Sequence, residues 1–318
     1  MRPITVFLIV LGYVVLFAAV FVLSFHTSIV RTVSVALKPL KVKWTHRSGI
    51  ICRDLPYKND YGNAYDLYIP AGLDPNRDQV LILYIHGGGF TGGTKDGGKL
   101  WCKFLADKGY ITAAVDYTVH NKKHSSDLHR MNQEISDCVE AICKRCQELG
   151  YRVTGMATTG ESAGGCLAML YAYSQPTDAP IPVKFVFQQT GPAHFDPADW
   201  GNGDAEAAAS FLSMMTGKRI TSEMVVNGEA EQEMIAISPA CLVNSGTVPT
   251  LCAYGPKDKI VPPVLKFKLF EAFEQYGVPY DYIEFPNSNH GMYSDPDKQR
   301  EYITKVLEYC KTYLKHQV

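Results

Sequence analysis

One serine of this chain has neighbours that suit it to act as a nucleophile. Ser162 stands at the centre of a Gly-Glu-Ser-Ala-Gly stretch, residues 160–164. The residues before it (153–158) are typical of a strand, and those after it (166–173) of a buried helix. A serine at a sharp strand-to-helix turn projects its hydroxyl, and the flanking glycines remove side chains that would clash there. So short a pattern recurs by chance, so the serine needs partners elsewhere in the chain.

Two such partners follow strand-like segments later in the sequence. Asp258 ends a Gly-Pro-Lys-Asp motif after residues 250–254, and His290 lies in an Asn-His-Gly motif after residues 280–285. Because both motifs follow strand ends, we expect them at the same edge of a sheet as Ser162. In such a group the histidine accepts the hydroxyl proton and the aspartate orients the histidine. We therefore predict a Ser162–His290–Asp258 catalytic triad.

A glycine-rich loop supplies the remaining requirement of acyl transfer. Gly87, Gly88 and Gly89 follow the strand-like residues 80–85 and His86. Consecutive glycines at a strand end expose backbone N–H groups, which can bind the oxyanion that develops during attack on a carbonyl. The alternative, a phosphate-binding loop, is disfavoured because the Gly-Lys-Ser/Thr ending of a P-loop is missing.

Other acidic residues and histidines of the chain are predicted to have no part in the catalytic chemistry. Asp281 is a second candidate acid, but it lies inside a predicted strand. Glu161, beside the serine, is predicted to be a buried or hydrogen-bonded structural carboxylate. His120, His124 and His129 lie in a polar loop without a recognisable ligand helix, so we expect surface histidines and no metal site.

The cysteines point to no cofactor. The spacing of Cys138, Cys143 and Cys146 also occurs in iron–sulfur proteins, but here it lies in the helix-like stretch 130–149 and suits a half-buried helix face. Nine scattered cysteines argue against a disulfide framework and fit a reducing compartment. We predict no cofactor.

The elements that must position these residues alternate along the chain. A hairpin (50–55 and 64–69) is followed by continuous apolar strands separated by helices, a pattern typical of a mostly parallel sheet covered on both faces. Between residues 195 and 243 the alternation stops, and we predict a helical lid insertion that shapes an apolar pocket.

These motifs together resemble a known family. From about residue 50 onward the chain resembles the α/β-hydrolases, specifically the hormone-sensitive-lipase-like carboxylesterases and acetyl esterases. The resemblance rests on His-Gly-Gly-Gly-Phe (86–90), Gly-Glu-Ser-Ala-Gly-Gly (160–165) and the motifs of Asp258 and His290. It implies the triad above and no cofactor. The oxyanion donors it implies are the N–H groups of Gly88, Gly89 and Ala163, with His86, Gly87, Gly160 and Gly164 supporting the loops.

The sequence departs from the family pattern in two places, and both weaken the inference about the substrate. After Asp116-Tyr117 the family usually continues Arg-Leu-Ala-Pro, whereas this chain has Thr118-Val119-His120. The cap helices common in the lipase-like subfamily are replaced by an apolar N-terminus and a connector.

That N-terminus predicts a membrane anchor. Residues 4–23 carry no charge, and as a helix they would span about 30 Å. A cleaved signal peptide is the alternative, but the apolar region is long and lacks a clear cleavage site. We divide the chain into an anchor and flank (1–30), a basic connector (31–48) and a hydrolase domain (49–318). More cations follow the span than precede it, which favours a cytoplasmic domain on a single-pass membrane protein.

Composition narrows the function further. The chain has 318 residues, 46% of them hydrophobic and 20% charged, with a net charge of −1. It has no basic stripe with interleaved aromatics, which disfavours a nucleic-acid partner. The main prediction is a serine hydrolase of small to medium acyl or acetyl esters. Two alternatives stay open, an amide-bond hydrolase such as a peptidase or arylformamidase, and a catalytically dead interaction protein. The oligomeric state is not determined.

Overall fold

A single eight-stranded sheet organises the protein. The computed structural model describes residues 30–174, 179–200 and 203–314. The strand order is β1-β2-β4-β3-β5-β6-β7-β8, and β2 alone runs against the others. The strands are β1 Gly49–Pro56, β2 Ala64–Pro70, β3 Asp78–Ile85, β4 Ile111–Val115, β5 Arg152–Glu161, β6 Val183–Gln189, β7 Thr250–Tyr254 and β8 Tyr280–Glu284. The predicted mostly parallel sheet is confirmed.

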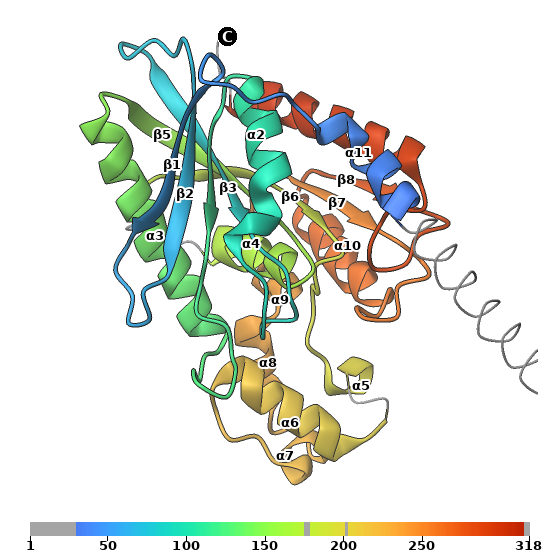
Figure 1. Cartoon of the computed structure of the whole chain (residues 1–318). Coiled ribbons are helices and arrows are strands. Elements are labelled where there is room, and N and C mark those ends of the chain that lie inside the picture. The colour runs from blue at the N-terminus through green and yellow to red at the C-terminus, as the bar shows by residue number, and fades with distance from the viewer. Residues whose placement is uncertain (1–29, 175–178, 201–202, 315–318) are drawn as a thin grey trace, which may run out of the picture.

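Helices cover both faces of this sheet, as the alternating pattern predicted (Figure 1). One apolar core joins the sheet to α3, α4 and α10, and a second joins it to α2 and α11. These helices span α2 Lys99–Asp107, α3 Leu128–Glu148, α4 Ala163–Tyr173, α10 Leu265–Tyr276 and α11 Pro296–Tyr309, which continues as a π-helical turn, Cys310–Leu314. A short 3₁₀ turn, η2 Lys95–Gly98, precedes α2.

The register of the sheet collects the candidate chemistry at one edge. Ile85, the last residue of β3, pairs with Gly160 near the end of β5. At the other side, Tyr254 at the end of β7 pairs with Glu284 at the end of β8. The loops that leave β3, β5, β7 and β8 therefore all start at the same edge of the sheet.

The cysteine-containing helix α3 is an ordinary amphipathic helix. Cys138 and Cys146 are buried with Ile135 and Ile142 in the core beneath the sheet. All nine cysteines are free. Burial raises the pKa of the Cys146 thiol to about 12, so this sulfur stays a neutral, apolar packing group. The interpretation of these cysteines as small core residues is confirmed.

The N-terminal part that the structure describes packs onto the domain. Residues 30–36 are helical and lead into η1, Lys38–Leu40. Ala36 and Leu40 are buried, and Leu40 belongs to the core that contains Trp101. Part of the predicted connector 31–48 therefore packs on the domain, because Ala36 and Leu40 are buried and η1 contacts α2. Local composition does not reveal this packing, and the division of the chain at residue 48 stays a prediction.

The predicted membrane span, residues 4–23, lies outside the described residues. Among the described residues, no helix combines the length and the apolar character needed to cross a bilayer.

The segment that interrupts the alternation is helical, as predicted. It contains α5 Pro197–Trp200, α6 Ala205–Thr216, α7 Ser222–Val226, α8 Glu231–Ile237 and α9 Pro239–Leu242. Most of these helices project beyond one end of the sheet (Figure 1). Phe195 and Trp200 stack on each other, and Phe195 also approaches Phe90 of the glycine-rich loop.

The loop after β4 is held by a buried carboxylate. Glu134 of α3 is 4% exposed and accepts hydrogen bonds from the Thr118 amide (2.7 Å) and hydroxyl (2.8 Å). Arg130 Nε (3.1 Å) and Asn63 Nδ2 (3.2 Å) donate to the same carboxylate. Two residues further on, the His120 amide donates to the Phe90 carbonyl (2.8 Å). The segment 118–120, where the sequence departs from the family, is thus held by α3 at Thr118 and by the glycine-rich loop at His120.

We expect the Glu134→Ala variant to lose about 3 kcal/mol of the free energy of unfolding, because the buried Thr118 donors lose their acceptor. Urea unfolding followed by tryptophan fluorescence measures this loss. Glu140→Ala is the matched control, since Glu140 is an exposed residue of the same helix, and we expect a change within about 0.5 kcal/mol. Equal losses in the two variants would show that the network contributes nothing.

Candidate active site

The turn that carries Ser162 is built around a left-handed backbone. Ser162 has φ 56° and ψ −127°, between the end of β5 and the start of α4. A Cβ on Gly164 would lie 2.0 Å from the Ile85 carbonyl oxygen, and one on Gly160 would lie 2.4 Å from the Gly164 carbonyl carbon. The turn is therefore compatible only with glycine at both positions. Its serine hydroxyl is held out from the strand–helix junction.

Three distant side chains meet at this hydroxyl. His290 Nε2 lies 2.9 Å from Ser162 Oγ, and His290 Nδ1 lies 2.7 Å from Asp258 Oδ2. The Asp258 side chain is 2% exposed, and that of His290 is 24% exposed. The sheet thus brings together the three residues predicted from the order of the motifs. The alternative acid Asp281 lies within β8, paired with Leu251, and does not take part.

The loops that hold Asp258 and His290 are locked to each other. Asp258 Oδ1 accepts hydrogen bonds from the amides of Ile260 (2.8 Å) and Val261 (3.0 Å), so Oδ2 remains for the imidazole. This carboxylate therefore favours the tautomer in which Nδ1 carries the proton, leaving Nε2 to accept the serine proton. The two loops also meet through their backbones. A Cβ on Gly255 would lie 2.4 Å from the Ser288 carbonyl oxygen, so only glycine permits this approach.

Asp295 braces the histidine loop, and the sequence analysis missed it. Its carboxylate accepts hydrogen bonds from the Ser288 hydroxyl (2.7 Å) and from the amide (3.0 Å) and side chain (2.9 Å) of Asn287. Burial opposes ionisation, but these hydrogen bonds and the charge of Lys257 outweigh it and lower the pKa of Asp295. Its signal in the sequence is an Asp-Pro pair at the start of α11.

The glycine-rich loop curls back toward Ser162. Gly88 has φ 125° and Gly89 has φ 62°. A Cβ on Gly87 would lie 2.5 Å from the Glu161 carbonyl oxygen, and one on Gly88 would lie 2.2 Å from the Gly92 carbonyl oxygen. The close approach of these backbones requires glycine at positions 87 and 88.

His86 holds the base of this loop. Its ring stacks on Tyr117, with ring centroids 4.2 Å apart, and its Nδ1 lies 2.8 Å from the Gly87 carbonyl oxygen. The Tyr117 hydroxyl donates to the His86 carbonyl (2.8 Å), a contact that the sequence analysis did not predict. Burial lowers the pKa of His86, so its imidazole is neutral at pH 7.

The amides of this region are available to a substrate. Within the described part of the chain, the amide nitrogens of Gly88, Gly89 and Ala163 donate no hydrogen bond to another residue. Ala163 is the first residue of α4, where amides have no partner in their own helix. Three free donors near one hydroxyl form a group that can bind a developing oxyanion.

A cavity of about 550 Å³ opens over Ser162 and His290. Polar groups of the glycine loop line one part of it, and Leu37, Ile260, Met292 and Tyr293 line another. No described residue of the insertion 195–243 lines this cavity, so the lid function of that insertion stays a prediction. Leu37 comes from the N-terminal segment, a contribution that the sequence did not reveal.

Glu161 also reaches this cavity. Trp101 Nε1 donates to Glu161 Oε1 (3.4 Å). Burial raises the pKa of Glu161, while the Trp101 hydrogen bond and the charge of His290 oppose that shift. The carboxylate has no contact with Ser162 Oγ among the hydrogen bonds of the described residues, which fits a structural role.

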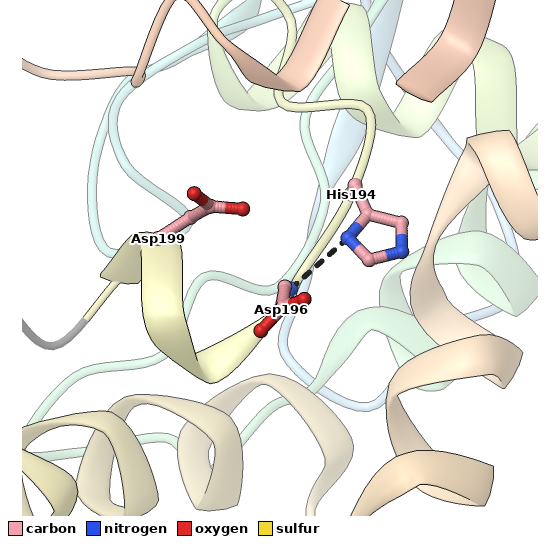
Figure 2. Close-up of side chains that lie close together, drawn as sticks. All are labelled: His194, Asp196 and Asp199. Carbon is pink, nitrogen blue, oxygen red and sulfur yellow. Dashed lines mark hydrogen bonds between the residues drawn. The ribbon is translucent and has the colours of Figure 1, made fainter. Parts of the chain in front are cut away.

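A group of side chains that could bind a metal lies outside the loop of the predicted histidines. The predicted loop histidines do not converge: His120 Nδ1 bonds the Ser126 carbonyl (2.9 Å), and His124 packs on Tyr61. Among the described residues the single candidate group is His194, Asp196 and Asp199, whose ligand atoms lie within 4.8 Å of one another (Figure 2).

The group in Figure 2 is explained by the turn that starts α5. His194 Nδ1 accepts a hydrogen bond from the Asp196 amide (3.2 Å), as the dashed line marks. Asp196 Oδ1 accepts one from the Ala198 amide (3.0 Å), as helix-capping residues do. Because His194 Nδ1 and Asp196 Oδ1 already accept hydrogen bonds from the backbone of this turn, we assign no metal to the group.

Lys95, the first residue of η2, is surrounded by three carboxylates. Lys95 Nζ lies 2.7 Å from Asp54, 3.4 Å from Asp66 and 3.7 Å from Asp116. Burial lowers the pKa of Lys95, but the three carboxylates outweigh it and the pKa is raised overall. The Lys95 amide also donates to Asp116 Oδ1 (2.6 Å), which ties the end of the glycine loop to the residue before Tyr117.

Comparison with known proteins gives a family and a fold. The family model described as BD-FAE matches residues 65–273. A probable isoprenylcysteine alpha-carbonyl methylesterase of Oryza sativa subsp. japonica is 23% identical over 279 residues, which cover 82% of this chain and 62% of that protein. A kynurenine formamidase of Danio rerio is 28% identical over 117 residues, 37% of each chain. The matched region is thus only part of each of these relatives.

Solved structures agree on the fold. Esterase Est2 of Thermogutta terrifontis superimposes with a TM-score of 0.63 at 18% identity, covering 83% of this chain and 92% of that one. A truncated carbohydrate esterase from gut microbiota gives a TM-score of 0.62 at 15% identity, covering 84% and 100%. At these identities the likeness shows the α/β-hydrolase fold that the sequence predicted.

We expect the Gly88→Ala variant to fold and to lose at least about 100-fold in turnover of an ester, because its Cβ collides with Gly92 and displaces the loop amides. Steady-state kinetics and circular dichroism measure the two properties. The matched control is Gly62→Ala, which also has positive φ but no atom within 4 Å of the new Cβ, and its turnover should be unchanged. Equal turnover in both variants would exclude a role for the loop.

Proposed function

The chain belongs to the BD-FAE family, and from this premise we propose that it is a serine carboxylic-ester hydrolase. The observation that carries the proposal is the continuous chain of hydrogen bonds from Asp258 through His290 to the Ser162 hydroxyl. A buried carboxylate, an oriented imidazole and a hydroxyl on a strained turn together form an activated nucleophile. The full set of partners argues against a catalytically dead interaction protein.

In the mechanism we propose, Ser162 Oγ attacks the ester carbonyl carbon while His290 Nε2 accepts its proton. The amides of Gly88, Gly89 and Ala163 bind the resulting oxyanion, and removal of one such donor typically costs about 10²–10³ in rate. His290 then protonates the leaving alcohol, and an acyl-enzyme remains on Ser162. A water molecule then attacks the acyl carbon while His290 Nε2 takes its proton. His290 returns this proton to Ser162 Oγ as the Oγ–acyl bond breaks, which releases the carboxylic acid and restores the serine. These steps require no cofactor.

The substrate class we propose is a small to medium acyl or acetyl ester. The cavity volume of about 550 Å³ falls in the range typical of small-molecule sites. Its apolar part, formed by Leu37, Ile260 and Met292, suits an acyl chain or an apolar alcohol. The methylesterase relative acts on an ester according to its name, which favours the same bond type here.

An amide-bond hydrolase is the second candidate. The kynurenine formamidase relatives support it, because a formamide is cleaved through the same kind of tetrahedral intermediate. The triad chemistry does not distinguish the two bonds by itself.

We also propose that residues 4–23 anchor the protein in a bilayer as a single-pass segment, with the catalytic domain on the cytoplasmic side. The proposal rests on the uncharged apolar sequence and on the cations that follow it. We propose residues 49–318 as the hydrolase domain, on which residues 30–48 are packed, and we leave the oligomeric state undetermined.

We expect a fluorophosphonate probe to label the wild-type protein at Ser162 and the Ser162→Ala variant not at all. Gel fluorescence and peptide mass spectrometry measure the labelling. Asp258→Asn should retain the fold but lower turnover by about 10⁴-fold, because the histidine loses its orientation and tautomer. A Ser162→Ala variant that is still labelled would refute the assignment of the nucleophile.

We expect p-nitrophenyl acetate and butyrate to be hydrolysed much faster than the matching p-nitroanilides, as an ester hydrolase requires. Release of p-nitrophenol and p-nitroaniline gives kcat/KM for both bonds. A higher kcat/KM for the anilides would instead favour the amide-bond hydrolase.

A further inference from the structure

Two segments that border the catalytic cavity expose large apolar side chains. Residues 30–40 contribute Leu37 to the cavity wall, and residues 256–268 contribute Ile260. On these segments five large hydrophobic residues are between 44% and 65% exposed. We call this set the apolar rim: Val30, Val35, Ile260, Val264 and Phe267. Contiguous exposed apolar side chains mark interaction sites, and both of these segments border the cavity through one residue each.

The same segments are strongly basic. The exposed cations of residues 30–43 and 256–268 are Arg31, Lys38, Lys41, Lys43, Lys257, Lys259 and Lys268. Residues 30–43 contain no acidic residue, and the single one in 256–268 is the buried Asp258 bound to His290. Among the described residues none of these seven cations forms a close ion pair with a carboxylate, although the charge of Lys257 acts on Asp295. The whole chain has a net charge of −1, so this concentration of positive charge is confined to these two segments.

The position of the rim links it to the chain's apolar N-terminus. The described structure starts at Val30, itself a rim residue, and Leu37 in the cavity wall follows seven positions later. Residues 24–30, even if fully extended, reach about 25 Å from the end of the uncharged stretch 4–23. In Figure 1 this first helical segment, in blue, is drawn close to α11, and its Leu37 lines the same cavity as His290.

We propose that the apolar rim and its cations dock on an anionic membrane surface, so that the catalytic cavity opens toward the bilayer and receives amphiphilic esters from it. The inference deepens the proposed hydrolase function and rests on it. Valine, isoleucine and phenylalanine side chains would enter the boundary between headgroups and acyl chains, and the lysines and arginine would contact anionic headgroups.

The mixture of residues favours a lipid surface over a protein partner. The core of a protein interface is depleted of lysine, because each buried ammonium must be desolvated and paired. Here apolar and cationic side chains alternate on the same two segments, as at a membrane interface, where apolar groups are immersed and ammonium groups stay at the headgroup level.

The first test places a fluorophore on the rim of the full-length protein in vesicles of phosphatidylcholine and phosphatidylserine. We expect lipids brominated on their acyl chains to quench the emission added by Phe267→Trp. The matched control is Val226→Trp, at an exposed position of α7 in the insertion, whose added emission should be unaffected. Emission from position 267 that is equal in brominated and ordinary lipid would overturn the proposal, and so would quenching that is unchanged without phosphatidylserine.

The second test separates this proposal from the hydrolase function. The Val264→Ser/Phe267→Ser variant, neither of whose side chains lines the cavity, should hydrolyse vesicle-embedded 4-methylumbelliferyl oleate about tenfold more slowly. Its hydrolysis of soluble p-nitrophenyl acetate should stay within about twofold of wild type, which also reports correct folding. Val226→Ser should change neither rate.

The two tests distinguish a failure of the docking proposal from a failure of the proposed hydrolase function. If the rim variant hydrolyses both esters at wild-type rates while Ser162→Ala hydrolyses neither, the docking proposal fails and the hydrolase function stands. If Ser162→Ala retains both activities, the proposed function fails and the docking proposal fails with it.

Discussion

The left-handed backbone at Ser162 is the constraint on which the rest of the site depends. A non-glycine residue at φ 56° costs on the order of 1–3 kcal/mol, and the surrounding structure must hold it there. The amide of Ser162 donates to the Gln189 carbonyl (2.9 Å), and β5 is paired on both sides in the middle of the sheet. Gly160 and Gly164 permit β5, α4 and the end of β3 to approach within contact of their backbones. The strain is therefore supported by the stiffest part of the fold.

The other parts of the site are loops, and each is tied down by a buried polar contact. Asp295 holds the histidine loop, Tyr117 holds the glycine loop through the His86 carbonyl, and the Asp258 carboxylate is shared between two amides and the imidazole. Such contacts position catalytic groups without covering them, so the cavity stays open while the hydrogen-bond geometry is preserved. Lys95 and Glu134 extend this support to the sheet edge and to α3.

The N-terminal segment connects the chemistry to the outside of the molecule. Leu40 anchors it in a core beside α2, and this burial brings Leu37 into the cavity wall. The same segment carries exposed apolar and basic side chains away from the domain. One short stretch therefore contributes to the substrate cavity and to the surface around its entrance, so changes in it would affect both.

The sequence by itself determined the alternation of strands and helices, the insertion after β6, and the order in which Ser162, Asp258 and His290 follow their strands. Periodicity and glycine placement report local burial and local backbone geometry, so they were sufficient for these features. Only the tertiary structure decided that residues 30–40 pack on the domain, that Tyr117, Lys95 and Asp295 brace the site, and that Leu37 lines the cavity. These contacts join residues far apart in the chain, and no local pattern encodes which distant surface a half-apolar turn or a lone carboxylate will meet once the sheet has formed.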